Sequence, residues 1–307
     1  MNTFFGYNLR GRYNMRPNNE CEYYKSLQIG EENVTEIYDI DIFPTQNISN
    51  FKYHFTYRNE YKILLDKYRL ADIAGQNSTF IKAINIMNWI TKKTYYCGHS
   101  GLDKNDIFSI IDYSFDKGFS GAINCEQKAL LLSECLLALK IFSHPVGLER
   151  CDFNEANDKV TSINCHVVVH VYLEEENRWI MFDPSFNAYF IDENDKVLNI
   201  VEIRENLNQE RCVNLAQYSL NGHYDIFKKS YPPNFIFNMA FRLSVYDGNL
   251  PQEKVYNQNL IFPMNVDSRK IYRLKQIANG MRPEDADVLC EKVRYISASE
   301  LLNPPQW

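Results

Sequence analysis

Several short motifs are missing from this sequence, and each absence removes a class of function. No G-x-G-x-x-G or P-loop pattern is present, which argues against a nucleotide held by such a loop. No G-x-S-x-G pattern is present either, so the sequence does not indicate a serine hydrolase. The eight cysteines contain no C-x-x-C pair, and neither they nor the histidines have the spacing of metal ligands. We therefore predict no metal and no cofactor.

Long apolar runs and an excess of positive charge are also missing. No apolar run approaches the length of a membrane span. The first twenty residues have neither the apolar core nor the small-residue cleavage site of a signal peptide. Acidic residues outnumber basic ones by 39 to 33, which argues against nucleic acid or an anionic membrane as the main partner. We expect a cytoplasmic protein with reduced thiols. The sequence does not indicate its oligomeric state.

The residues that are present suit a large globular core. Hydrophobic residues make up 45% of the 307 positions and charged residues 23%. The first 50 residues are polar and Asn-rich, and the last hundred mix many aromatic residues with prolines. We expect three regions, which are an N-terminal arm with a helical extension (1–75), a catalytic core (76–207) and an aromatic-rich extension packed on the core (208–307).

The apolar periodicity predicts helices first and consecutive strands afterwards. Helices are expected over 57–70, over 79–93 after a cap at Asn77 or Ser78, over 106–118 and over 125–141. Strands are expected over 144–151, 163–173, 178–183, 188–192 and 196–201, separated by turn-forming segments. This order, with helices before an antiparallel meander, predicts an α+β fold.

The segment "GAINCEQKALLL" (121–132) places Cys125 at the start of an apolar helix. Because apolar residues occupy nearly every side of this helix, we expect it to be buried. Asn124 is the expected N-cap, and its amide is a weaker candidate for holding an oxyanion. The first turn of a helix stabilises a thiolate through its backbone N–H groups and dipole. The alternative is that Cys125 is a small apolar side chain that fills the helix end, as we expect for Cys135.

A hairpin is expected to bring His166 and Asp183 together. Successive side chains of a strand point to opposite faces of the sheet, so His166 and Asp183 are expected on one face. Cys165 points to the other face and is expected to pack there. Pairing of Val171 with Arg178 would place His166 opposite Asp183, and a slip of two residues would leave them diagonal neighbours. His170 is the competing histidine, and Asp183 has the alternative role of beginning a turn.

Cys125, His166 and Asp183, in this order along the chain, resemble the site of the transglutaminase-like superfamily. "CEQKALLLSECLLALKIFSHPVGL" (125–148) is similar to its cysteine helix and following strand, and "HVVVHVYLEEENRWIMFDPSF" (166–186) to its histidine strand, acidic turn, Trp strand and Asp-Pro-Ser/Thr ending. The resemblance extends from about residue 78 to about 205. It implies a papain-like α+β core with Cys125 as nucleophile, His166 as base and acid, and Asp183 as the residue that orients the imidazole.

These features together predict a cysteine-dependent enzyme that cleaves or exchanges an amide or peptide bond through a thioester on Cys125. The expected partner is a peptide or protein amide substrate, and hydrolysis is the favoured outcome. Two alternatives are an amide-forming transferase of transglutaminase type and a non-catalytic binding or scaffold protein with the same fold.

Overall fold

The structure is a computed structural model. It describes residues 27–29, 32–34, 53, 55–98, 100–102, 106–154, 159–209, 211, 213–217, 242–245, 259–261, 273–274, 276–278, 280–292, 294–295 and 301–306. Most of the expected N-terminal arm, most of the expected extension over 208–307, and His54, His99 and His223 lie outside these residues. The division into three regions remains a prediction.

Between residues 59 and 138 the chain is mainly helical. Its helices are α1 (Asn59–Tyr68), α2 (Leu70–Ala74), α3 (Thr79–Lys93), α4 (Ile107–Ser114) and α5 (Cys125–Ala138), with a 3-10 turn at Gly118–Gly121 between the last two. Ser78 caps α3 by accepting a hydrogen bond from the Ile81 N–H. Of the two candidate caps, Asn77 and Ser78, the structure therefore uses Ser78.

Three of the predicted helices were too long, and the one expected over 125–141 ends at Ala138. The helix expected over 57–70 is divided at Arg69, whose φ of 52° lies in the left-handed region. The helix expected over 106–118 ends at Ser114 because the chain turns at Asp116, which has a φ of 57° and donates its backbone N–H to Lys93 O.

A six-stranded sheet forms the other half of the architecture. In spatial order its strands are β10 (Arg294–Tyr295), β9 (Asn259–Ile261), β8 (Arg242–Val245), β3 (Ser143–Asn154), β4 (Lys159–Leu173) and β5 (Arg178–Phe182). All neighbours are antiparallel except β10 and β9. Two small antiparallel pairs lie outside this sheet, β1 (Leu27–Ile29) with β2 (Glu32–Val34) and β6 (Tyr189–Ile191) with β7 (Asn214–Gln217).

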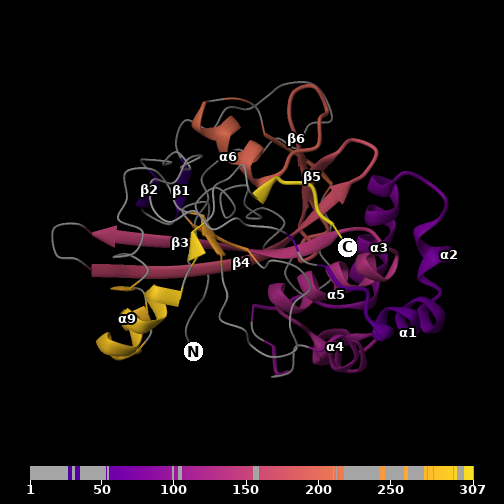
Figure 1. The fold of residues 1–307 in the computed structure, drawn as a ribbon, viewed down its shortest axis with the longest axis horizontal. Helices are drawn as coiled ribbons and strands as arrows, with labels where there is room; N and C mark the ends of the chain where they lie inside the picture. Colours follow the sequence, from indigo (N-terminus) through magenta and orange to yellow (C-terminus); the bar gives the residue numbers. More distant parts are fainter. Residues whose placement is uncertain are drawn as a thin grey trace.

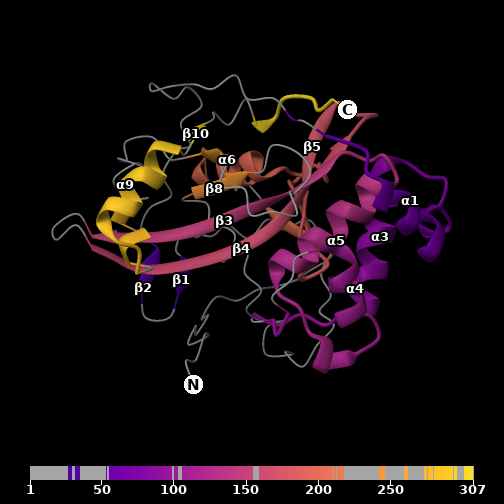
Figure 2. The same ribbon diagram turned by 60° about the horizontal axis from the view of Figure 1, so that its bottom comes forward.

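Helix α5 is the centre of the helical layer. It packs against β3 and β4 on one side and against α1, α3 and α4 on the others. In Figures 1 and 2 these helices gather at one end of the long β3–β4 pair, while α9 (Pro283–Lys292) lies at its other end. Every residue from Gln127 to Ala138 is buried, as its all-round apolar sequence predicted. The predicted α+β fold, with a buried helix against an antiparallel sheet, is confirmed at this level.

The register of the β4–β5 hairpin differs by two residues from the first expectation. Val171 pairs with Ile180, and Leu173 pairs with Arg178 across the turn 174–177. A shift of two residues keeps every side chain on its own face of the strand, so the apolar faces of β4 and β5 still match. His166 and Asp183 are consequently diagonal neighbours on one face, which is the second of the two expected arrangements.

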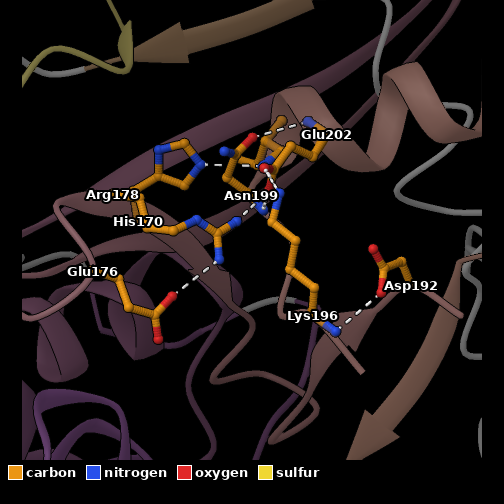
Figure 3. Close-up of polar contacts among 8 residues, drawn as sticks. His170, Glu176, Arg178, Asp192, Lys196, Asn199 and Glu202 are labelled. Carbon is orange, nitrogen blue, oxygen red and sulfur yellow. Dashed lines mark hydrogen bonds and ion pairs between the residues drawn. The ribbon is translucent and has the colours of Figure 1, made fainter. Parts of the chain in front are cut away.

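The strand expected over 196–201 is wrong. Val197 forms one isolated bridge with Ile191, and the chain then enters α6 (Ile200–Asn208). Figure 3 shows the reason, which is a reciprocal capping box: Glu202 N–H donates to Asn199 Oδ1 at 2.9 Å, and Asn199 N–H donates to Glu202 Oε2 at 2.9 Å. The short apolar run "VLNIV" is compatible with either structure, and this cap selects the helix.

The acidic turn of the hairpin also fixes the helical layer. Glu175 accepts a hydrogen bond from the Thr79 N–H at 2.7 Å, so its carboxylate lies at the N-terminus of α3, where the helix dipole favours negative charge. Arg178 at the start of β5 pairs with Glu202 of α6 at 2.5 Å (Figure 3). These contacts hold the β4–β5 hairpin between helices that are far apart in the sequence.

Candidate active site

Cys125 is the first residue of α5, and the cap in front of it fixes its position. Asn124 Oδ1 accepts a hydrogen bond from the Gln127 N–H at 2.9 Å, and Gln127 Oε1 accepts one from the Asn124 N–H at 3.3 Å. Gln127 also donates its side-chain amide to Leu102 O at 3.0 Å. Asn124 is therefore the N-cap that the sequence predicted. Cys125 is partly exposed although the helix behind it is buried.

The loop that leads to Cys125 is packed too closely to admit any residue but glycine at one point. A Cβ atom on Gly121 would lie 2.5 Å from Tyr113 O and 2.6 Å from the Lys117 Cβ. Two residues later, Ile123 lies beside Tyr96 in a parallel bridge. Its backbone N–H donates to Tyr95 O, and its carbonyl oxygen accepts from the Cys97 N–H. The start of α5 is thus held by α4 on one side and by residues 95–97 on the other.

His166 on β4 contacts both other predicted site residues. It is fully buried, and its Nε2 donates a hydrogen bond to Asp183 Oδ2 at 2.7 Å. Cys125 lies close enough to His166 to contribute to the rise in the pKa of the imidazole. Since Asp183 occupies Nε2, Nδ1 is the ring nitrogen through which the imidazole can exchange a proton with the thiol. The structure therefore brings Cys125, His166 and Asp183 together in the order thiol, imidazole, carboxylate.

Asp183 follows β5 directly and is held by its own turn. Its Oδ1 accepts the Ser185 N–H at 2.9 Å, while its backbone forms an isolated antiparallel bridge with Ala188. Asp183 thus begins a turn, as the alternative interpretation expected, and it also binds His166. With one carboxylate oxygen held by the turn and the other by the imidazole, the rotamer of this fully buried side chain is fixed.

Two opposing effects determine the charge of His166. Burial lowers the pKa of an imidazole because the charged form loses its hydration. The charge of Asp183 and the hydrogen bond to it, with smaller contributions from Cys125 in the same direction, more than offset this, and the pKa of His166 rises from 6.5 to about 10. At neutral pH His166 is therefore an imidazolium that contacts a carboxylate and a thiol.

Phe186 packs against His166 and Tyr96 packs against Phe186, and the sequence analysis identified neither ring. The ring of Phe186 lies 5.6 Å from the imidazole, and Tyr96 packs edge-on against Phe186 at 5.3 Å. Phe186 lies in the turn that follows Asp183, so its position after the Asp-Pro pair was the available signal. Tyr96 gave no such signal, because only the pairing of residues 95–97 with Ile123 brings it here.

His170, the competing histidine, lies in a separate cluster. Its ring stacks on Trp179 at 6.1 Å and meets His144 edge-on at 5.6 Å. Its Nε2 accepts a hydrogen bond from the Ile200 N–H at 3.4 Å (Figure 3). Burial lowers the pKa of His144 to about 3, and burial together with His144 lowers the pKa of His170 well below 6.5. Both rings are neutral structural groups near neutral pH.

The remaining candidate residues have simpler roles. Cys135 is fully buried in the core, where burial raises the pKa of its thiol to about 12. The side chain of Cys165 lies outside the described residues. Ser120 donates its hydroxyl to Lys117 O at 2.7 Å. Lys128, one turn after Cys125, is completely buried, which a single lysine in an apolar helix does not reveal from sequence.

Within the described residues, no group of three or more His, Cys, Asp or Glu side chains is placed to hold a metal ion. In the same part of the chain, no helix is long and apolar enough to cross a membrane. No protein-family model, curated protein or solved structure matches the chain.

Proposed function

We propose that this protein is a cysteine-dependent acyl-transfer enzyme of transglutaminase-like type that acts on an amide or peptide bond. The observation that carries the proposal is the contact of one imidazole, His166, with the Asp183 carboxylate on one side and the Cys125 thiol on the other. Partial exposure of Cys125, against full burial of the two partners, suits a nucleophile that meets an incoming carbonyl.

The reaction follows from these positions. The Cys125 thiolate attacks the amide carbonyl and forms a C–S bond, and the carbonyl π electrons move to oxygen to give a tetrahedral oxyanion. The backbone N–H of Cys125, in the first turn of α5, has no acceptor within the helix and is a candidate donor to that oxyanion. His166 then protonates the leaving nitrogen as the C–N bond breaks, which leaves a thioester on Cys125.

The second half of the cycle determines the product. Neutral His166 accepts a proton from water as the water oxygen attacks the thioester; the C–S bond then breaks, which releases a carboxylic acid and the Cys125 thiolate and leaves the proton on His166. A primary amine in place of water would give a new amide. We favour hydrolysis because many members of the superfamily that the chain resembles are proteases or peptidases.

The test is a partition experiment on the thioester. The protein is incubated with a library of peptides and glutamine-containing amides, and the acyl-enzyme is then chased with water alone or with a millimolar primary amine. Free acid as the main product at modest amine concentration supports hydrolysis. Amide products that dominate under the same conditions would favour the transferase, and turnover that persists in Cys125→Ser would overturn the proposal.

A further inference from the structure

Helix α3 contains two asparagines, and each one binds a group outside the helix. Asn85 donates its side-chain amide to the carbonyl oxygen of Ala74, the last residue of α2, at 2.9 Å. Asn88, one turn further along, is an acceptor: its Oδ1 accepts the side-chain amide of Asn187 at 2.8 Å and that of Gln217 at 3.3 Å. Asparagine is a weak helix former, so these contacts, and not helix propensity, account for both positions.

Asn187 lies in the turn that begins at Asp183. It is buried, and its φ of 52° lies in the left-handed region, which asparagine tolerates better than most residues. A buried side-chain amide is costly without an acceptor, and Asn88 Oδ1 supplies one. Gln217 of β7 adds a second contact by donating to Asn187 O at 3.1 Å. Helix α3, the turn and β7, which are distant in the sequence, therefore meet at one side-chain oxygen.

The turn transmits this contact to Asp183. Asp183 and Ala188 exchange backbone hydrogen bonds in both directions, at 2.8 Å and 2.9 Å, so residues 183–188 form a closed loop. Within the loop, the Ser185 N–H donates to Asp183 Oδ1 at 2.9 Å and fixes the carboxylate relative to the loop. The loop itself is attached to α3 and β7 through Asn187, so a displacement of Asn187 moves the carboxylate that binds His166.

The same helix also holds the chain in front of Cys125. Just after the end of α3, Tyr95 O accepts the Ile123 N–H at 2.9 Å, and the Cys97 N–H donates to Ile123 O at 3.0 Å. Ile123 precedes Cys125 by two residues. Helix α3 is thus connected to the thiol side of the site through the residues that follow it, and to the carboxylate side through Asn88.

We propose that Asn88 is a positioning residue of the candidate site: by holding Asn187, its side-chain oxygen sets the place of the Asp183 carboxylate opposite the His166 imidazole. The inference rests on the proposed function, in which Asp183 has to orient the imidazole through both halves of the cycle. Asn88 touches no reacting atom. It acts through the turn, and α3 gives the thiol and the carboxylate a common frame.

Four variants isolate this contact. Asn88→Leu removes the acceptor and keeps a side chain of similar shape, whereas Asn88→Asp retains an oxygen that accepts both amides. Asn85→Leu is the matched control, because it also costs α3 a side-chain hydrogen bond, but one to α2. Asn187→Gly removes the donor and keeps the left-handed backbone without strain. It tests the same contact from the other side if Asn88→Leu does not fold.

The first measurement needs no substrate. In a Cys125→Ala background, which removes the titration of the thiol, the His166 resonance is followed by NMR against pH and assigned by its loss in His166→Gln. Asn88→Leu should lower the titration midpoint by about one unit, because a more distant carboxylate stabilises the imidazolium less. Asn85→Leu and Asn88→Asp should leave the midpoint in place. A midpoint that Asn88→Leu and Asn187→Gly both leave unchanged, or an equal fall in Asn85→Leu, would overturn the inference.

The second measurement separates kcat from KM with a peptide or amide substrate. Asn88→Leu should lower kcat by about tenfold, short of the roughly hundredfold that a misplacement of about 1 Å costs. KM should stay unchanged, because Asn88 does not contact the substrate in this account, and Asn88→Asp should restore kcat. A raised KM with unchanged kcat, or a kcat that Asn88→Asp does not restore, would contradict the inference. Absence of turnover in the wild-type protein would instead overturn the proposed function, and the NMR titration would then decide whether Asn88 positions Asp183.

Discussion

The two thiols of α5 illustrate how position determines the chemistry of a residue. Cys125, at the helix start, is partly exposed and interacts with the His166 imidazolium, whereas Cys135, ten residues later, is enclosed by apolar side chains. We expect an alkylating agent at limiting concentration and pH 6 to label Cys125 before any other cysteine, since an ordinary thiol is almost fully protonated there. Peptide mapping after short reaction times measures this. Labelling spread evenly over the cysteines would contradict it.

A pair of histidine variants provides the control for that experiment. His166→Ala removes the imidazolium that contacts Cys125, so low-pH labelling should fall to the rate of an ordinary exposed thiol. His170→Ala removes a neutral ring beside Trp179 and should leave the labelling of Cys125 unchanged. Loss of reactivity in the His170 variant alone would mean that the wrong histidine has been assigned.

Asp183→Asn should separate catalysis from folding. The amide keeps the shape of the carboxylate but loses its charge, so turnover should fall by about a thousandfold or more through the wrong imidazole tautomer.

Because the pKa of folded His166 is raised from 6.5 to about 10, its pairing with Asp183 stabilises the protein fully below pH 6.5 and progressively less as the pH rises toward 10. The difference in unfolding free energy between wild type and variant, from urea titrations, should shrink over that range. A constant difference would refute this account of the pair.

At the scale of elements, Gly121 is the point at which the chain before α5 tolerates least change. A methyl group there would collide with the backbone of Tyr113 and the Lys117 side chain, so Gly121→Ala must displace the loop that delivers Cys125. We expect turnover to fall by on the order of a hundredfold, the effect of about a 1 Å misplacement. Gly98→Ala is the matched control, since a Cβ at Gly98 meets no atom within 4 Å. Unimpaired turnover in Gly121→Ala would show that the loop is not needed to position the thiol.

How far the elements could be predicted depended on the kind of signal each one carried. The buried helix at Cys125 and its Asn124 cap followed from apolar periodicity and a capping residue. Alternation of side chains determined which faces of the hairpin match, but the length of its turn allowed two registers, and the one with Leu173 opposite Arg178 is formed. The helix at Ile200 was missed because its capping box, Asn199 with Glu202, lies inside a short apolar run. Lys128 was missed because periodicity does not reveal which polar residue of a buried helix is itself buried.

At the scale of the whole molecule, a buried aromatic cluster joins distant parts of the chain. Tyr53 packs against His144 and Trp179 at 5.0 Å each. Its hydroxyl donates to Leu301 O at 2.6 Å, and the Trp179 indole N–H donates to Asn303 O at 2.9 Å, so the cluster also anchors the described C-terminal segment. Tyr53, which precedes the helical layer, and the C-terminal residues 301–306 are thus both held on the sheet by the rings that surround a pair of neutral histidines.

This cluster should make the protein sensitive to acid. The folded-state pKa of His144 is lowered from 6.5 to about 3, so the unfolded chain binds the extra proton and stability falls as the pH drops below 6.5. Each such histidine contributes a slope of about 1.4 kcal/mol per pH unit. His144→Phe, which keeps a ring but cannot be protonated, should reduce the slope of unfolding free energy against pH between 6 and 4 by that amount. An identical slope in variant and wild type would contradict this prediction.

The central claim is that Cys125 forms a covalent acyl intermediate, and intact-mass spectrometry of a rapidly quenched reaction tests it most directly. The protein is mixed with peptide and glutamine-amide donors, quenched in acid, and the adduct is located by peptide mapping. The account predicts the mass of one acyl group on Cys125, absent from Cys125→Ser and retained in a Cys135→Ser control. A folded protein that carries no acyl group on Cys125 with any donor, or that carries it on another residue, would contradict the account.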